Sequence, residues 1–186
     1  MTSGPLRGRL LVASPTLTDP NFARTVVLVL EHSDDDGALG VVLTRPSATP
    51  VAEVLPAWAP LAAEPAVAFV GGPVSPNAAI CLGWAGPGEH PAGWTGIDGR
   101  LGAVDLSQDP PPVEGALECV RIYAGYASWG AAQLEAEIVL GAWYVIDALP
   151  ADPFVTAPSR LWRQVLRRQG GSLALVSTFP PDPTRN

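Results

Sequence analysis

The sequence predicts an α+β fold in a single domain that spans residues 1–186. The chain has 186 residues, of which 47% are hydrophobic, and this fits one domain with a sizeable core. Many short segments rich in Val and Leu are bounded by Gly, Pro and Asp, which is typical of strands joined by turns. Few segments have helical spacing, and hairpins lie among the strands, so an α+β fold is favoured over a doubly wound parallel sheet.

The first two thirds of the chain are expected to be mainly strands. Apolar runs between polar boundaries predict strands at Arg9–Ser14, Thr25–His32, Leu39–Arg45, Ala66–Val70, Ala78–Trp84 and Leu101–Leu106. One short helix is expected at Val51–Trp58, ended by Pro60. Residues 86–100 and 107–115 are rich in Gly and Pro or in Asp and Pro, which predicts loops.

The last third is expected to alternate strands with helices. The same criteria predict strands at Glu118–Ala127, Trp143–Ala148 and Leu173–Thr178. A helix is expected at Ala131–Leu140, and a second at Pro158–Gln169. The second has a proline near its start and two glycines after its end, which is the usual asymmetry of helix boundaries.

Charge and composition exclude several classes of function. The net charge is −7 and the pI about 4.7, so the surface should repel nucleic-acid backbones. All basic residues are arginines, which excludes Schiff-base and P-loop lysine chemistry. No apolar run is long enough to span a membrane and no secretory signal is evident, so a cytoplasmic location is expected. Cys81 and Cys119 lie far apart in the sequence and are expected to be free thiols.

The stretch EHSDDDGALG places His32 beside three consecutive aspartates. A calcium loop that begins at Asp34 needs glycine at its sixth position and glutamate at its twelfth. Gly37 is the fourth residue and Arg45 the twelfth, so the spacing excludes that motif. A zinc site would need further ligands from elsewhere in the chain. We therefore expect a solvated hairpin turn and assign no metal ligand.

Two other motifs offer chemistry. In GYASWG, Ser128 could be a hydrolase nucleophile on a tight turn from strand to helix, but the preceding glycine of G-x-S-x-G is Tyr126. In the last helix, arginines face away from an apolar stripe; they are Arg160, Arg163, Arg167 and Arg168. A solvated helix face is favoured there, and nucleic-acid binding through these arginines is the alternative.

Five segments together resemble the YqgE/AlgH family of bacterial proteins. They are Gly8–His32, Gly37–Pro46, Val70–Val74, Arg121–Val145 and Leu161–Gly171. The resemblance implies a compact α+β domain with a mostly antiparallel, partly barrel-like sheet and a cytosolic location. It brings no activity, because the family has no established one. The label of transcriptional regulator that is often attached to the family does not describe a mechanism. The position of Ser128 is commonly glycine in the family, which weighs against a serine nucleophile.

The sequence and the resemblance together favour a non-catalytic protein that binds a protein partner or a small ligand. No catalytic residue and no cofactor is expected, and direct contact with nucleic acid is disfavoured. The alternatives are a hydrolase-type enzyme and a regulator that uses the arginine helix. The residues of the family motifs that we expect on a functional surface are Asp19, Phe22, Arg24, Glu31, His32, Arg45, Trp129, Gln133 and Glu135.

Overall fold

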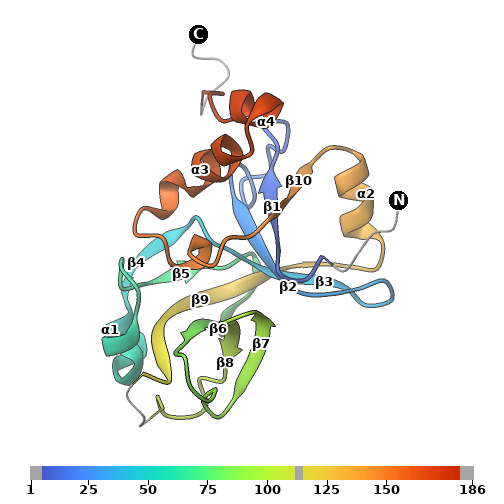
Figure 1. The fold of residues 1–186 in the computed structure, drawn as a ribbon. Coiled ribbons are helices and arrows are strands. Elements are labelled where there is room, and N and C mark those ends of the chain that lie inside the picture. Colours follow the sequence, from blue (N-terminus) through green and yellow to red (C-terminus); the bar gives the residue numbers. More distant parts are fainter. Residues whose placement is uncertain (1–5, 112–114, 181–186) are drawn as a thin grey trace.

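A strongly curved, mostly antiparallel sheet organises the molecule (Figure 1). The structure is a computed structural model that describes residues 6–111 and 115–180. Within these residues the order along the sheet is β10-β1-β2-β3-β9-β6-β8-β7, and β4 and β5 form a branch beside β9. The strands are β1 Arg9–Ala13, β2 Val26–Ser33, β3 Gly37–Val42, β4 Pro46–Pro50, β5 Val67–Val70, β6 Val74–Ala85, β7 Trp94–Asp98, β8 Leu101–Val104, β9 Leu117–Trp129 and β10 Trp143–Asp147.

Short helices cover the sheet from several sides. They are α1 Val51–Val54, α2 Gln133–Val139, α3 Leu161–Arg168 and α4 Gly171–Val176, with 3-10 turns at Pro56–Leu61, Asp152–Phe154 and Pro158–Arg160. In Figure 1, α2 stands beside β10 on one side of the molecule, and α3 and α4 lie together at the end opposite β6, β7 and β8. No helix among the described residues is long and apolar enough to cross a membrane.

Strands β1, β2 and β3 are buried on both faces. One face carries Leu10 and Leu28 and joins the core that α3 completes, and the other carries Leu11 and Val27 and joins the core under α2. A third core, around Trp58, lies on the other half of the sheet. Burial on both faces explains why the segments of β1 and β2 are continuous apolar runs rather than alternating ones.

The predicted α+β class and partly barrel-like sheet are confirmed, and most predicted strands are present. Two strands were not predicted: β4, which begins and ends with proline, and β7, which lies in the expected loop at residues 86–100. Among the described strands, β4 pairs only with β5, and β7 pairs only with β8. Edge strands tolerate proline and irregular pairing, so neither carries the apolar signal of a central strand.

Three further expectations are wrong. Leu173–Thr178 is not a strand, because α4 occupies Gly171–Val176 and packs on α3 through Leu173 and Val176, which are three residues apart. The helix at Val51–Trp58 is split at Leu55 into α1 and a 3-10 turn that begins with Pro56. The motif GYASWG is not a tight turn, because β9 continues to Trp129.

The paired glycines after β5 bring that segment against β9. The Gly71 carbonyl accepts from the Val42 amide at 2.8 Å, and the Gly71 amide donates to the Ala124 carbonyl at 2.8 Å. Gly71 thereby bridges β3 and β9 where these strands do not pair directly. A Cβ on Gly71 would lie 2.2 Å from the Gly125 carbonyl oxygen, so two of the family motifs meet at a contact that only glycine allows.

Candidate functional site

A β-bulge at Leu30 decides which way the family-motif residues of β2 point. Val29 pairs with Gly40, but Glu31 pairs with Leu39, so Leu30 is an extra residue. One extra residue exchanges the two faces for every side chain that follows it. Because of the bulge, Glu31 points to the side of Leu39, and His32 points to the opposite side, where α2 lies.

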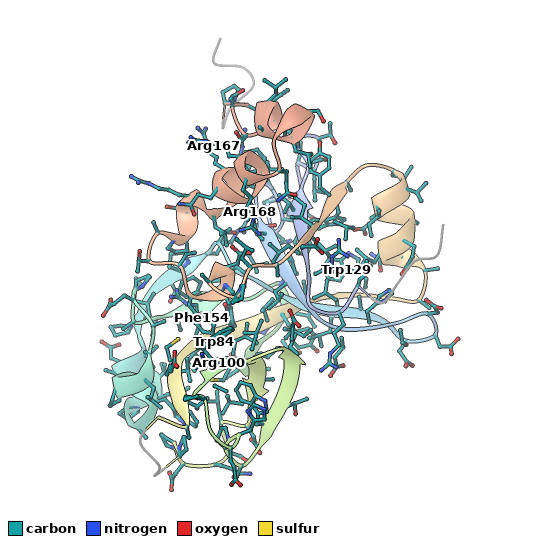
Figure 2. All side chains as sticks on the ribbon, in the orientation of Figure 1. Trp84, Arg100, Trp129, Phe154, Arg167 and Arg168 are labelled. Carbon is teal, nitrogen blue, oxygen red and sulfur yellow. The ribbon has the colours of Figure 1, made fainter. Side chains whose placement is uncertain are left out.

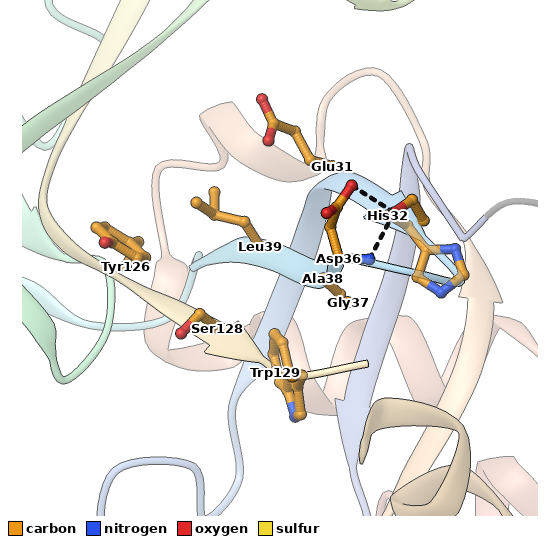
Figure 3. A pocket seen from close by; sticks show the side chains of 11 residues that line it. Glu31, His32, Asp36, Gly37, Ala38, Leu39, Tyr126, Ser128 and Trp129 are labelled. Carbon is orange, nitrogen blue, oxygen red and sulfur yellow. Dashed lines mark hydrogen bonds between the residues drawn. The ribbon is translucent and has the colours of Figure 1, made fainter. Parts of the chain in front are cut away.

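Beside the bulge lies an open groove of about 510 Å³, between the β2–β3 hairpin and the end of β9 (Figure 3). Leu39 pairs with both Glu31 and Ser128, so these three side chains form a row across three strands. Tyr126, two residues before Ser128 on β9, lines the same groove. The groove therefore combines an acidic end with an apolar and aromatic wall.

The second carboxylate of the groove, Asp36, is fixed by the hairpin turn. The Ser33 hydroxyl donates to the Asp36 carboxylate at 3.0 Å and accepts from the Asp36 amide at 2.9 Å. The predicted hairpin turn is confirmed, and Asp34–Asp36 are exposed at its tip. The run of three aspartates is thus a solvated turn of which one member, Asp36, lines the groove.

His32, which also lines the groove, ties together three parts of the chain. Its side chain is 5% exposed, and its Nε2 lies 2.6 Å from the Glu135 carboxylate on α2. The Leu6 amide donates to its Nδ1 at 3.3 Å, so Nδ1 is the acceptor and Nε2 carries the proton. The hydrogen bond from His32 lowers the pKa of Glu135 from its ordinary value. His32 and Glu135 therefore hold the N-terminal segment and α2 on the sheet.

His32, Asp34 and Glu135 also form the one group of potential metal ligands found in the described residues, with ligand atoms within 4.8 Å of one another. A metal on Nε2 requires the proton on Nδ1, and a ligating histidine donates that proton to an acceptor. Here a backbone N–H points at Nδ1, so metal binding would leave two donors facing each other. The hydrogen bonding of His32 thus opposes a metal site, although three ligands are close.

Trp129, Phe22 and Gln133 belong to the support of α2. Trp129 is stacked with Phe22 at a centroid distance of 6.0 Å, and Phe22 meets Trp143 edge-on at 5.6 Å. Both indole N–H groups donate to the same oxygen of Glu137, at 2.9 Å from Trp129 and 2.8 Å from Trp143. Gln133 donates to the other Glu137 oxygen at 3.0 Å.

The sequence did not point to Glu137, which lies within the predicted helix Ala131–Leu140 but in no recognised motif. Its two tryptophan partners come from β9 and β10, and no spacing in the sequence reveals that they converge. The only feature of the sequence that could have indicated a role for Glu137 is its position two residues after Glu135 on a short helix.

The remaining predicted residues contact the main chain rather than the groove. Asp19 accepts from the Asn21 amide at 2.8 Å, and Arg45 donates to the Pro20 carbonyl at 2.6 Å. Arg24 donates to the Phe179 carbonyl at 2.9 Å. Of the nine predicted surface residues, the groove is lined by Glu31, His32 and Trp129. The other six residues do not line the groove, and a functional role for them stays a prediction.

Ser128 lies inside a strand and lacks the setting of a hydrolase nucleophile. Because β9 continues through Trp129, the sharp turn that exposes such a serine is not formed at this position. Figure 3 shows Ser128 and the His32 ring on different sides of β3, and both His32 nitrogens already have partners. His90 is stacked on Trp94 at 5.1 Å in the other half of the sheet. The described residues thus contain no serine–histidine pair at the groove.

Replacing Glu135 with glutamine is expected to lower stability in a pH-dependent way. A carboxylate whose folded pKa is depressed stabilises the fold above its unfolded pKa, and this stabilisation is lost as the pH falls through the folded pKa. Glu135→Gln should therefore be less stable than the parent near neutral pH and equal to it in acid. Urea unfolding between about pH 3 and about pH 7 measures the difference. A constant difference across this range would contradict the assignment, and Glu53→Gln, at an exposed position on α1, is the control.

In comparisons with known proteins, nearly the whole chain matches a single family. A family model described as AlgH-like matches residues 10–174. The UPF0301 protein of Streptomyces avermitilis is 51% identical over 185 residues, covering 97% of this chain and 95% of the relative. The UPF0301 protein of Thermobifida fusca is 50% identical over 189 residues, covering 97% and 96%.

Two solved structures are also similar. A crystal structure of a Corynebacterium diphtheriae protein has 36% sequence identity and a TM-score of 0.87, covering 96% of this chain and 95% of its own. The solution structure of the AlgH protein from Pseudomonas aeruginosa has 30% identity and a TM-score of 0.67, with 97% coverage of both chains. The curved sheet and its helices are therefore shared with these proteins.

Proposed function

Because the chain belongs to the AlgH-like family, which has no established activity, we propose its function from its own geometry: it is a binding protein whose groove takes a positively charged group. Glu31 carries this proposal. The bulge turns its carboxylate toward the groove, and across the described chain it makes no hydrogen bond or ion pair. An exposed carboxylate held at the edge of a groove is available to a ligand.

The walls of the groove favour an organic cation. Asp36 adds a second carboxylate, so two negative charges face the same space. Tyr126 and Leu39 supply an aromatic ring and an apolar surface, against which an alkylammonium or guanidinium group can pack. The chain has a net charge of −7, which attracts cations at long range and repels DNA. The matching chemistry occurs in free diamines and in the lysine or arginine side chains of a protein partner.

The arrangement supports binding rather than turnover. Ser33 and Ser128 are the serines that line the groove, but the histidine beside it, His32, is held by Leu6 and Glu135. A hydroxyl nucleophile needs a base within hydrogen-bond reach. We therefore expect the ligand to be released unchanged.

Titration with agmatine, and in parallel with a short arginine-containing peptide, tests this function. Amide shifts in a ¹H–¹⁵N spectrum should move at residues 31–39 and 126–130 and saturate in at least one titration. Glu31→Gln should weaken binding about tenfold, because a charge-assisted contact is lost. The stronger of the two titrations distinguishes a free amine from a protein side chain as the source of the cation.

Glu53→Gln is the matched control, since it removes one exposed carboxylate on α1, outside the groove. It should change the dissociation constant by less than about twofold, through long-range charge alone. Equal weakening by the two variants, or chemical change of the ligand during the titration, would refute the proposed function.

A further inference from the structure

Three arginines gather where the first connection meets the C-terminal helices, far from the acidic groove. Arg163 and Arg167 lie one turn apart on α3, and Arg24 reaches the same place from the segment between β1 and β2. Figure 2 shows Arg167 on the outer side of α3, whereas Arg168 extends toward the sheet. The sequence favoured a solvated face for all four arginines of α3 and its preceding turn, but they have different surroundings.

Arg24 is fixed in place although its side chain forms no ion pair with any residue that the structure describes. Its backbone has φ of 57°, a left-handed conformation that non-glycine residues seldom adopt. Its guanidinium lies 4.6 Å from the ring centre of Trp162, and it donates to the carbonyls of Phe179 and Pro180. Trp162 is itself buried and donates its indole N–H to the Ala13 carbonyl at 2.8 Å. The Arg24 guanidinium is therefore held against the face of an indole ring that is itself fixed in the core.

Beside Arg24 is a hollow of about 360 Å³ lined by Arg163, Arg167, Ser177 and Thr178. The Ser177 hydroxyl donates to the Ala174 carbonyl at 2.6 Å, and the Thr178 hydroxyl donates to the Leu175 carbonyl at 2.7 Å. Both hydroxyl protons are therefore already donated to carbonyls of the protein. The donors that remain for a ligand are the guanidinium groups of Arg163 and Arg167, which are four residues apart on one helix face. Arg163 gives up little of its capacity, because its one hydrogen bond among the described residues is a long one, 3.5 Å, to the Phe179 carbonyl.

The charges of this cluster are not compensated by the described part of the chain. Arg9, Arg100 and Arg168 each pair with a carboxylate. Arg24, Arg163 and Arg167 have no such partner among residues 6–111 and 115–180. Instead, burial and the nearby Arg163 guanidinium lower the pKa of Arg24 from its ordinary value. In a chain with a net charge of −7, three neighbouring cations that meet no acid within residues 6–111 and 115–180 are unusual, and an anion would compensate their charge.

We propose that this hollow binds a phosphate group carried by a small molecule. Paired guanidinium groups match the oxygens of a phosphate, and a dianion is suited to a cluster of three positive charges. The acidic remainder of the surface repels a long polyanion, which favours a small phosphate ester over nucleic acid. This site is separate from the groove, so a phosphate ligand and a cationic ligand could be held by the same molecule.

Calorimetric titration of the full chain with pyrophosphate and with glycerol 3-phosphate, in buffer of low ionic strength, tests the proposal. We expect saturable binding of one equivalent. Arg163→Gln and Arg167→Gln should each weaken it about tenfold, because each removes charge-assisted hydrogen bonds. Circular dichroism should show that both variants remain folded, since both side chains are exposed.

Arg160→Gln is the control, because it removes one exposed arginine next to α3 that does not line the hollow. It should weaken binding by less than about twofold. If Arg160→Gln weakened binding as much as Arg163→Gln, only general attraction would operate and the site would be refuted. Failure to saturate by about 10 mM pyrophosphate, or binding of a single-stranded oligonucleotide in place of both small probes, would also overturn the proposal.

Discussion

Gly37→Ala is expected to lower the free energy of unfolding by about 4 kcal/mol, the largest effect of any single substitution considered. A Cβ on Gly37 would lie 2.0 Å from the Trp129 carbonyl oxygen and 2.7 Å from the Gly130 carbonyl carbon. Both contacts are with backbone, which a rotamer change cannot move. Gly37 also has φ of 88°, which strains any other residue. Alanine must therefore push β3 away from the end of β9, where the groove is formed.

Gly141→Ala separates the clash from the backbone strain. Gly141 has φ of 77°, close to that of Gly37, but a Cβ there would meet nothing within 4 Å. It should lose only about 1 kcal/mol, the usual cost of a left-handed alanine. Urea unfolding monitored by tryptophan fluorescence measures both variants. Equal losses at the two positions would show that the close approach of β3 and β9 is not needed for stability.

The hairpin that carries the groove was predictable, but the direction of its side chains was not. The run of three aspartates followed by Gly37 is a strong turn signal, and the turn lies at that place. A regular β2 strand would put Glu31 on the face of Val29, under α2, and His32 on the opposite face. The bulge at Leu30 reverses both. A bulge depends on how two strands pair across the sheet, and the residues from Val26 to His32 contain no local sign of it.

In the other half of the sheet, one glycine-containing strand was also not predictable from the sequence. Residues 86–100 were expected to be a loop because they are rich in Gly and Pro, yet β7 lies within them. A Cβ on Gly102 would lie 2.4 Å from the Trp94 ring, and one on Gly83 would lie 3.1 Å from it. Glycines on β8 and β6 therefore leave space for a tryptophan that covers them. The low β-propensity of glycine argues against a strand in the sequence. In the folded sheet, however, a bulky side chain on the neighbouring strand can require a glycine at that position.

Asp152→Asn is expected to lower the free energy of unfolding by about 3 kcal/mol, because it breaks a nearly buried ion pair. Both oxygens of Asp152 accept from Arg168, at 2.6 Å and 2.7 Å, and one also accepts from the Leu149 amide at 2.7 Å. The Asp152 side chain is only 5% exposed. Asparagine would direct an N–H₂ group at the Arg168 guanidinium, so this partly buried positive charge would lose its partner. Urea unfolding at neutral pH measures the loss.

Asp147→Asn provides the comparison at an exposed ion pair. Asp147 lies 3.0 Å from Arg9, but their side chains are 86% and 40% exposed, so its loss should cost less than about 1 kcal/mol. Joining Asp152→Asn with Arg168→Met should recover part of the stability, since the second change removes the charge that the first leaves unpaired. If the double variant were less stable than Asp152→Asn alone, then Arg168 would stabilise the fold mainly through its contact with the Asp147 carbonyl at 3.1 Å. The two outcomes thus decide whether the pair or the arginine alone holds α3 against the segment that follows β10.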